Sequence, residues 1–120
     1  MNKDILELAE MHKGKEYSKA LLKLSSVYEY NCTTEYIDNK LKAFLCYFTL
    51  PYVYDMICVT DKDNIYSYSL WKELSKYLKN RTREIRINST PTEKDRRVID
   101  KAIIKYNGYR EGNTLFFPID

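Results

Sequence analysis

Apolar residues recur every three or four positions in two segments near the start of the chain. Between Lys3 and Lys13 they form one helical stripe, and Gly14 follows the last turn. A second stripe with the same spacing runs from residue 15 to about residue 25. We therefore predict two consecutive helices that form a pair.

The period then changes to that of extended chain. Residues 27–36 are rich in aromatic and β-branched side chains, and 38–40 have the composition of a turn. Residues 41–50 are almost continuously apolar, as expected of a strand covered on both faces, and 53–59 form a third strand. The pattern predicts a three-stranded antiparallel meander.

The second half alternates between the two periods. A helix is predicted over 67–80, with Trp71 as an anchor in the core, and a short alternating strand over 83–88. A hydroxyl cap and acidic residues begin a further helix that ends near Tyr106, and a last strand covers 114–117. Strand, helix, strand in this half implies at least one crossover connection.

These elements define the expected fold class. We predict one α+β domain over residues 1–120, with a mixed, mainly antiparallel sheet flanked by about four helices. The sheet combines the three-stranded meander with a β-α-β unit. The chain has 44% hydrophobic and 31% charged residues, no apolar run of membrane-spanning length and no signal-peptide pattern, so we expect a soluble, cytoplasmic protein with no membrane partner.

Two residue types qualify this picture. Twelve tyrosines occur against three glycines, which suits a surface that contacts a partner, although an AT-rich coding sequence produces the same bias. Cys32, Cys46 and Cys58 lie in predicted strands with no Cys-x-x-Cys pair, and His12 is the only histidine. We predict buried, reduced thiols and no metal site, with a reactive thiol as the alternative.

The order of elements resembles the acetyltransferase fold of the Gcn-related N-acetyltransferase (GNAT) family without its first strand. Residues 103–110, Ile-Ile-Lys-Tyr-Asn-Gly-Tyr-Arg, are similar to the Tyr-x-x-x-Gly-Phe type of sequence that ends the last crossover helix of that family. The sequence also resembles the acetyltransferase-like proteins encoded among the virion genes of short-tailed phages. The resemblance implies a GNAT-like fold.

Two departures from the family concern its chemistry. The family holds acetyl-CoA with an Arg/Gln-x-x-Gly-x-Gly/Ala turn, but the corresponding residues 60–69 lack glycine and include Asp61 and Asp63. The family's general acid is a tyrosine four residues before the glycine, where this chain has Ile104, and Tyr106 faces elsewhere on the helix. The resemblance therefore implies an acyltransferase shape with no catalytic residues and no cofactor. An active acyl-CoA N-acyltransferase with an atypical cofactor turn is the alternative.

Basic residues gather in the second half of the chain. Between positions 72 and 105 there are eleven Lys or Arg against five Asp or Glu, which indicates a candidate basic contact face there. Because the net charge is only +3 and acidic residues are interleaved, we rank nucleic-acid binding behind a salt-bridged surface. The residues of this candidate face are Lys79, Arg81, Arg83, Arg86, Arg96 and Arg97.

These observations together predict a non-catalytic, acetyltransferase-like domain that binds protein. We expect a phage-encoded virion or assembly-associated protein of the host cytoplasm or the virion, whose partner is a virion component or a second copy. A small inhibitor or regulator of a host nucleic-acid enzyme is a second alternative, which would use the basic face.

Overall fold

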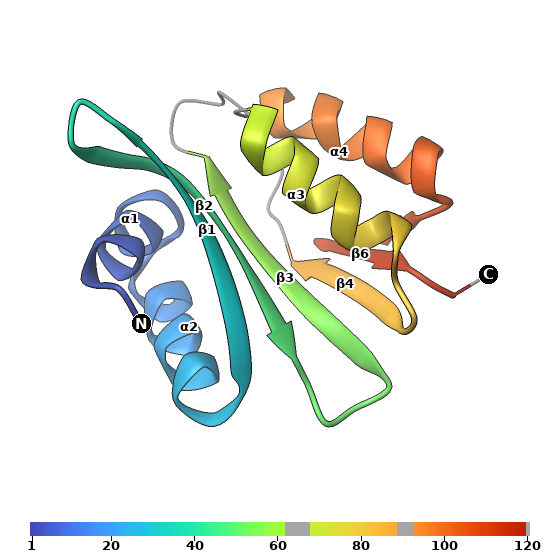
Figure 1. Ribbon diagram of the computed structural model, residues 1–120, viewed down its shortest axis with the longest axis horizontal. Coiled ribbons are helices and arrows are strands. Elements are labelled where there is room, and N and C mark those ends of the chain that lie inside the picture. Colours follow the sequence, from blue (N-terminus) through green and yellow to red (C-terminus); the bar gives the residue numbers. More distant parts are fainter. Residues whose placement is uncertain (62–67, 89–92, 120) are drawn as a thin grey trace.

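The computed structural model describes residues 1–61, 68–88 and 93–119, which form four helices and six strands (Figure 1). Both N-terminal helices and the meander lie where the hydrophobic period predicts them, with boundaries that differ by at most three residues. In chain order the elements are α1 (Lys3–Lys13), α2 (Lys15–Val27), β1 (Glu29–Ile37), β2 (Lys40–Thr49), β3 (Tyr54–Asp61), α3 (Tyr68–Lys79), β4 (Glu84–Asn88), α4 (Glu93–Tyr106), β5 (Tyr109–Glu111) and β6 (Thr114–Phe117).

The six strands form one mixed sheet in the order β1-β2-β3-β4-β6-β5. All neighbours are antiparallel except β3 and β4, which are parallel and joined through α3. The predicted α+β class, the antiparallel meander and the β-α-β unit are therefore confirmed. None of the helices in the described ranges is long and apolar enough to cross a membrane.

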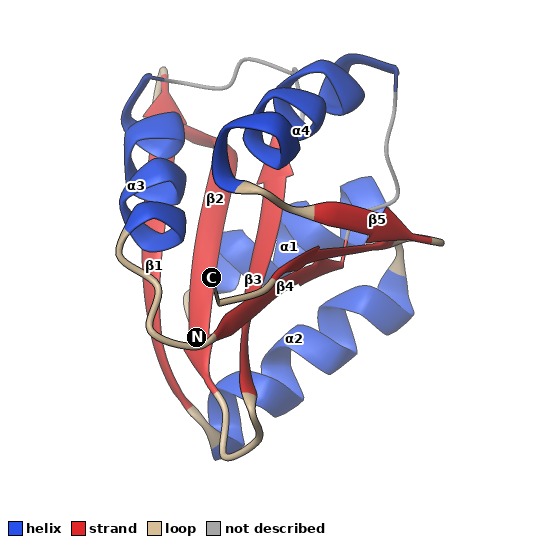
Figure 2. Ribbon diagram, turned by 90° about the vertical axis from the view of Figure 1, so that its right-hand side faces the viewer, coloured by secondary structure: helices blue, strands red, loops and turns tan. Residues whose placement is uncertain are grey.

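The helices lie on the two faces of the sheet, with α1 and α2 on one side and α3 and α4 on the other (Figure 2). The strand β2 is buried on both sides, because Ala43 and Leu45 belong to the core under α3 and α4, whereas Phe44 and Cys46 belong to the core under α1 and α2. The continuous apolar run of this strand is thus explained by coverage on both faces.

Turn chemistry sets the first hairpin. Asp38 and Asn39 have φ angles of 52° and 62°, the left-handed backbone that a tight two-residue hairpin requires and that Asp and Asn tolerate better than most residues. This turn places Ile37 opposite Lys40, and an irregularity between Glu35 and Tyr36 shifts the register by one residue for the rest of the β1-β2 ladder.

One strand was missed by the sequence pattern. Residues Tyr109–Glu111 form β5, which pairs with β6 through a turn at Gly112, whereas only a single last strand was predicted. A run of three residues is too short to show the two-residue alternation of a strand, so β5 is recognised only by its pairing with β6. Gly108 permits the approach, because a Cβ there would lie 2.6 Å from the ring of Phe117.

Trp71 packs against the core as predicted, but it lies at the margin of that core. Its ring packs against the α3/α4 core but is only partly buried, and the buried positions of α3 are Leu70, Leu74 and Leu78. A tryptophan at the margin of a core keeps part of its large surface in contact with water. The loss of stability expected on its removal is accordingly smaller than for a fully buried ring.

Candidate functional site

The helices α1 and α2 cover only part of their face of the sheet. The core beneath them contains residues of β2 and β3, with partly buried residues of β1, and no described residue of β4, β6 or β5. On this side of the last three strands, Asn88, Tyr109 and Glu111 are exposed. The same face is thus covered in the first half of the chain and open in the second.

A continuous row of stacked side chains runs from the β2-β3 connection and the start of β3 onto this open face. The rings of Tyr52 and Tyr54 lie 5.8 Å apart, and the guanidinium carbon of Arg86 lies 3.8 Å from the centre of the Tyr54 ring. On its other side the same guanidinium lies 5.0 Å from Phe116, whose ring stacks on Tyr109 at 5.1 Å and 10°. These five side chains, Tyr52, Tyr54, Arg86, Phe116 and Tyr109, are called the Arg86 stack below.

Strand register explains why the Arg86 stack forms. Arg86 lies opposite Phe116 in the β4-β6 ladder, and Phe116 lies opposite Tyr109 in the β5-β6 ladder. Ile85 and Ile87 are buried in the α3/α4 core, so the alternation of a strand sends Arg86 to the other face. Directly opposite residues share a face, which aligns the three side chains in one row.

The charge of Arg86 is held in place by one partner. Its Nε donates to Glu84 Oε2 at 2.8 Å, and the two side chains remain 33% and 21% exposed. The terminal nitrogens make no hydrogen bond with another described residue. A guanidinium between two rings is attracted by the negative faces of both, which leaves its edge oriented for a carboxylate or carbonyl from outside.

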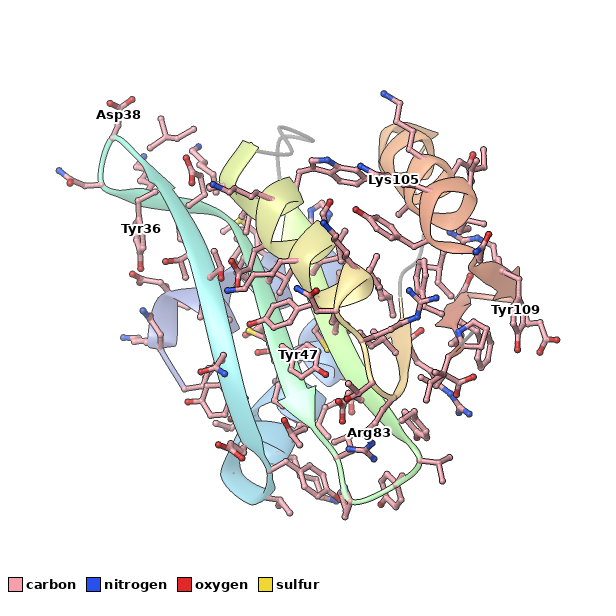
Figure 3. All side chains as sticks on the ribbon, turned by 45° about the vertical axis from the view of Figure 1, so that its right-hand side comes forward. Tyr36, Asp38, Tyr47, Arg83, Lys105 and Tyr109 are labelled. Carbon is pink, nitrogen blue, oxygen red and sulfur yellow. The ribbon has the colours of Figure 1, made fainter. Side chains whose placement is uncertain are left out.

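A second polar cluster lies on the opposite face of the sheet. Asp55, only 5% exposed, accepts hydrogen bonds from the Tyr47 hydroxyl, from Leu50 N at 3.3 Å and from Arg83 Nη1 at 2.7 Å. Arg83 also donates to Leu50 O at 2.9 Å. Burial and the neighbouring Asp55 raise the pKa of Tyr47. The cluster joins the β2-β3 connection to β4, and Figure 3 shows Tyr47 and Arg83 at one end of the sheet.

The predicted basic face is distributed over several places. Arg81 donates to three backbone carbonyls, those of Pro118 at 2.8 Å, Leu78 at 2.6 Å and Tyr106 at 2.9 Å, and so connects α3, α4 and the end of the chain.

Arg83 pairs with Asp55, as described above, and Arg86 lies on the other face. Lys79 is exposed, and the side chains of Arg96 and Arg97 lie outside the described residues. Contact of this set with phosphates stays a prediction.

A different group of lysines shares a groove. Lys72, Lys76 and Lys79 of α3 and Lys105 of α4 line a hollow of about 650 Å³, together with Glu73. Of the described residues of the predicted basic face, this lysine groove includes only Lys79. The spacing of three and four residues between its α3 lysines is a signal that could have identified it from the sequence.

The positions that carry the family resemblance are partly described. Ile104, at the place of the family's general acid, is 80% exposed on α4. Tyr106 packs against the α3/α4 core. The predicted absence of a phosphate-binding turn concerns residues 60–69, of which 62–67 lie outside the described residues.

A small apolar hollow lies beside α2, lined by residues that include Tyr17, Met56, Cys58 and Asn88. Its volume is about 170 Å³. It lies where β3 and β4 separate, because their pairing ends at Ile57 and Ile87.

In the described ranges, no group of three or more His, Cys, Asp or Glu residues is arranged to hold a metal ion.

Compared with protein-family models and with curated proteins, this sequence matches none of them.

Proposed function

We propose that this chain is a non-catalytic, acetyltransferase-like domain that binds a protein partner through the Arg86 stack. The observation that carries the proposal is a row of tyrosine, phenylalanine and arginine on an uncovered sheet face. Tyrosine and arginine are the residues most enriched at the energetic centres of protein interfaces. Rings that are already stacked lose little side-chain entropy on binding.

The acetyltransferase-like part of the proposal is supported by the order of elements. The two helices, the meander, and the alternation of α3, β4 and α4 occur in the order on which the resemblance depends. The strands on either side of α3 are parallel neighbours, as a β-α-β unit demands. The exposed Ile104 supports the non-catalytic part, since an aliphatic side chain cannot donate a proton.

The biological setting follows from the same resemblance. We propose a phage-encoded, virion or assembly-associated protein that meets its partner in the host cytoplasm or in the virion. The partner is a virion component or a second copy of the chain.

Protein binding is tested with the proteins encoded by neighbouring genes and with the chain itself. Tyr109→Ala removes one exposed end of the Arg86 stack, and Tyr36→Ala is the matched control, because the two tyrosines are 45% and 42% exposed at opposite edges of the sheet (Figure 3). We expect Tyr109→Ala to weaken binding roughly 30-fold, the effect of a typical hot-spot residue. Equal affinities for wild type and both variants would contradict this use of the surface.

The non-catalytic part is tested separately by calorimetric titration with acetyl-CoA. An active acyl-CoA transferase is the second candidate, and the size of the hollow beside α2 argues against it. Its volume of about 170 Å³ is below the roughly 300 Å³ at which ligand pockets begin. We expect no binding heat, and micromolar affinity would establish the enzyme in place of the binding domain.

The lysine groove supports the remaining candidate, a regulator of a host nucleic-acid enzyme. Four lysines around one hollow could neutralise several phosphates, and such binding weakens steeply with salt. Its test is retention on DNA and RNA columns at low and moderate salt. Lys72→Glu with Lys76→Glu should abolish any salt-sensitive retention, whereas the control pair Lys15→Glu with Lys23→Glu on α2 should not. Equal elution of all three proteins excludes direct nucleic-acid contact by this groove.

A further inference from the structure

The three cysteines, scattered in the sequence, form one row in the structure. In the β1-β2 ladder Cys32 lies opposite Cys46, and in the β2-β3 ladder Cys46 lies opposite Cys58. Directly opposite residues point to the same face, so all three thiols lie beneath α1 and α2. The cysteines are 14 and 12 residues apart in the sequence, and the two antiparallel ladders place them side by side across three neighbouring strands.

The three thiols differ in access. Cys32, on the edge strand, is partly buried, whereas Cys46 and Cys58 are 0% and 4% exposed. The thiol of Cys46 donates a hydrogen bond to the sulfur of Cys32, which lowers the pKa of Cys32 and raises that of Cys46. Burial raises the pKa of Cys58 to about 11. Cys32 is therefore both the most accessible thiol and the one whose thiolate is best stabilised.

We propose that Cys32 and Cys46 are a redox modification site, in which a hydroperoxide converts the two opposed thiols to a cross-strand disulfide. Opposite residues of an antiparallel pair have Cα atoms about 4.5 to 5.5 Å apart, which lies inside the range of about 4.4 to 6.8 Å found for disulfides. Because Cys32 and Cys46 lie directly opposite each other in the ladder, their side chains leave the sheet side by side on the same face.

The reaction balances in two steps. The Cys32 thiolate attacks one oxygen of the hydroperoxide, so an S–O bond forms, the O–O bond breaks, and the departing alkoxide or hydroxide takes up a proton. The sulfur of Cys46 then attacks the sulfenic sulfur of Cys32, forming the S–S bond and expelling hydroxide, which leaves as water with the proton of Cys46. Two electrons pass from the thiols to the O–O bond, and an external dithiol reverses the change.

The structure assigns the second sulfur to Cys46 and not to Cys58. Cys58 has no opposed position on β1, and its sulfur reaches Cys32 only across Cys46. Cys58 is itself 4% exposed and lies beside the Tyr17 side chain. The modification would fasten the edge strand β1 covalently to β2, without the participation of β3.

The experiment exposes the folded, full chain to a slight excess of hydrogen peroxide and measures its intact mass before and after reduction. Wild type and the control Cys58→Ala should lose the mass of two hydrogen atoms and regain it with dithiol, and peptide mapping should join Cys32 to Cys46. Cys32→Ala should stay unoxidised. Cys46→Ala should stop at a sulfenic acid on Cys32 that a carbon-acid probe traps.

Several outcomes would overturn the assignment. These are a folded wild type that keeps all its thiols, a disulfide mapped to Cys46 and Cys58, or unchanged oxidation of Cys32→Ala. Because Cys46 is buried, its variant could lose the fold. Cys32→Ala changes a partly buried residue on an edge strand, so we expect it to keep the fold. If Cys46→Ala does not fold, the comparison of wild type with Cys32→Ala still tests the proposal.

Discussion

One face of the sheet is covered by helices in the first half of the chain and open in the second half. Over β1, β2 and β3 it is sealed by α1 and α2, and Phe44 and Cys46 beneath them are fully buried. Over β4, β6 and β5 no described residue joins the core under α1 and α2, and the Arg86 stack lies there instead. The alternation of side chains along the strands is the same in both halves. Coverage by helices, and not the strands themselves, decides in which half this face is buried and in which half it is exposed.

The opposite face makes the contrast sharper, because α3 and α4 seal it across both halves. Ile57 of β3, Ile85 of β4 and Leu115 of β6 belong to one continuous core there. The last three strands are therefore held by burial on one side only. Their other side is free to carry polar and aromatic groups at little cost to folding.

The strongest test of this contrast removes one phenylalanine from each half. Phe44→Ala deletes a ring that is 0% exposed, and we expect it to lower the free energy of unfolding by about 3 to 5 kcal/mol. Phe116→Ala deletes a ring on the open face and should cost clearly less. Urea denaturation of both variants measures the difference, and equal losses would mean that the open face is buried in the free protein.

Alkaline pH provides a second test of the sealed half. The pKa of Cys58 is raised by burial to about 11, so in the unfolded chain this thiol ionises near pH 9 while the folded protein keeps it neutral. Stability from this group is complete below pH 9 and is lost as the pH rises toward 11, by roughly 2 to 3 kcal/mol. Unfolding free energies of wild type and Cys58→Ala between pH 8 and 11 check this. Parallel curves for the two proteins would show that Cys58 is not sealed.

Two basic residues that lie close together in the sequence, Arg81 and Lys79, should contribute differently to stability. Arg81 satisfies three backbone carbonyls at the α3/α4 end, so Arg81→Ala should cost about 1.5 to 3 kcal/mol. Lys79→Ala, two residues away and exposed, is the matched control and should change stability by less than about 0.5 kcal/mol. Thermal and urea unfolding measure both, and an equally small effect for Arg81 would show that its contacts do not hold the fold.

The smallest expected effect belongs to the open face. Arg86→Ala removes a partly exposed ion pair and a cation placed over two rings, which together contribute about 1 kcal/mol or less. The same change should weaken partner binding much more than it weakens folding. Unfolding and binding measured on one preparation test this, and a large loss of stability with unchanged binding would reverse the functional interpretation of the two halves.

Much of the fold could be predicted because the period of apolar residues is local. The spacing of three and four residues located all four helices, and the continuous run around Phe44 and Cys46 identified a strand covered on both faces. The candidate surfaces were harder to predict. The predicted basic face included both Arg81, which binds backbone carbonyls inside the fold, and Arg86, which lies on the surface. Closeness in the sequence does not show which backbone carbonyls lie near a side chain in space.

The amino-acid sequence by itself determined the kinds of element, their order, most of their boundaries and the turn at Asp38 and Asn39. Only the tertiary structure decided the β5-β6 pairing, the alignment of three cysteines and the exposure of Arg86. Helical and strand periods arise from the backbone of a few adjacent residues, so they can be read along the chain. Register and coverage arise between segments far apart in the chain, so they exist only once the sheet is assembled and its helices are in place.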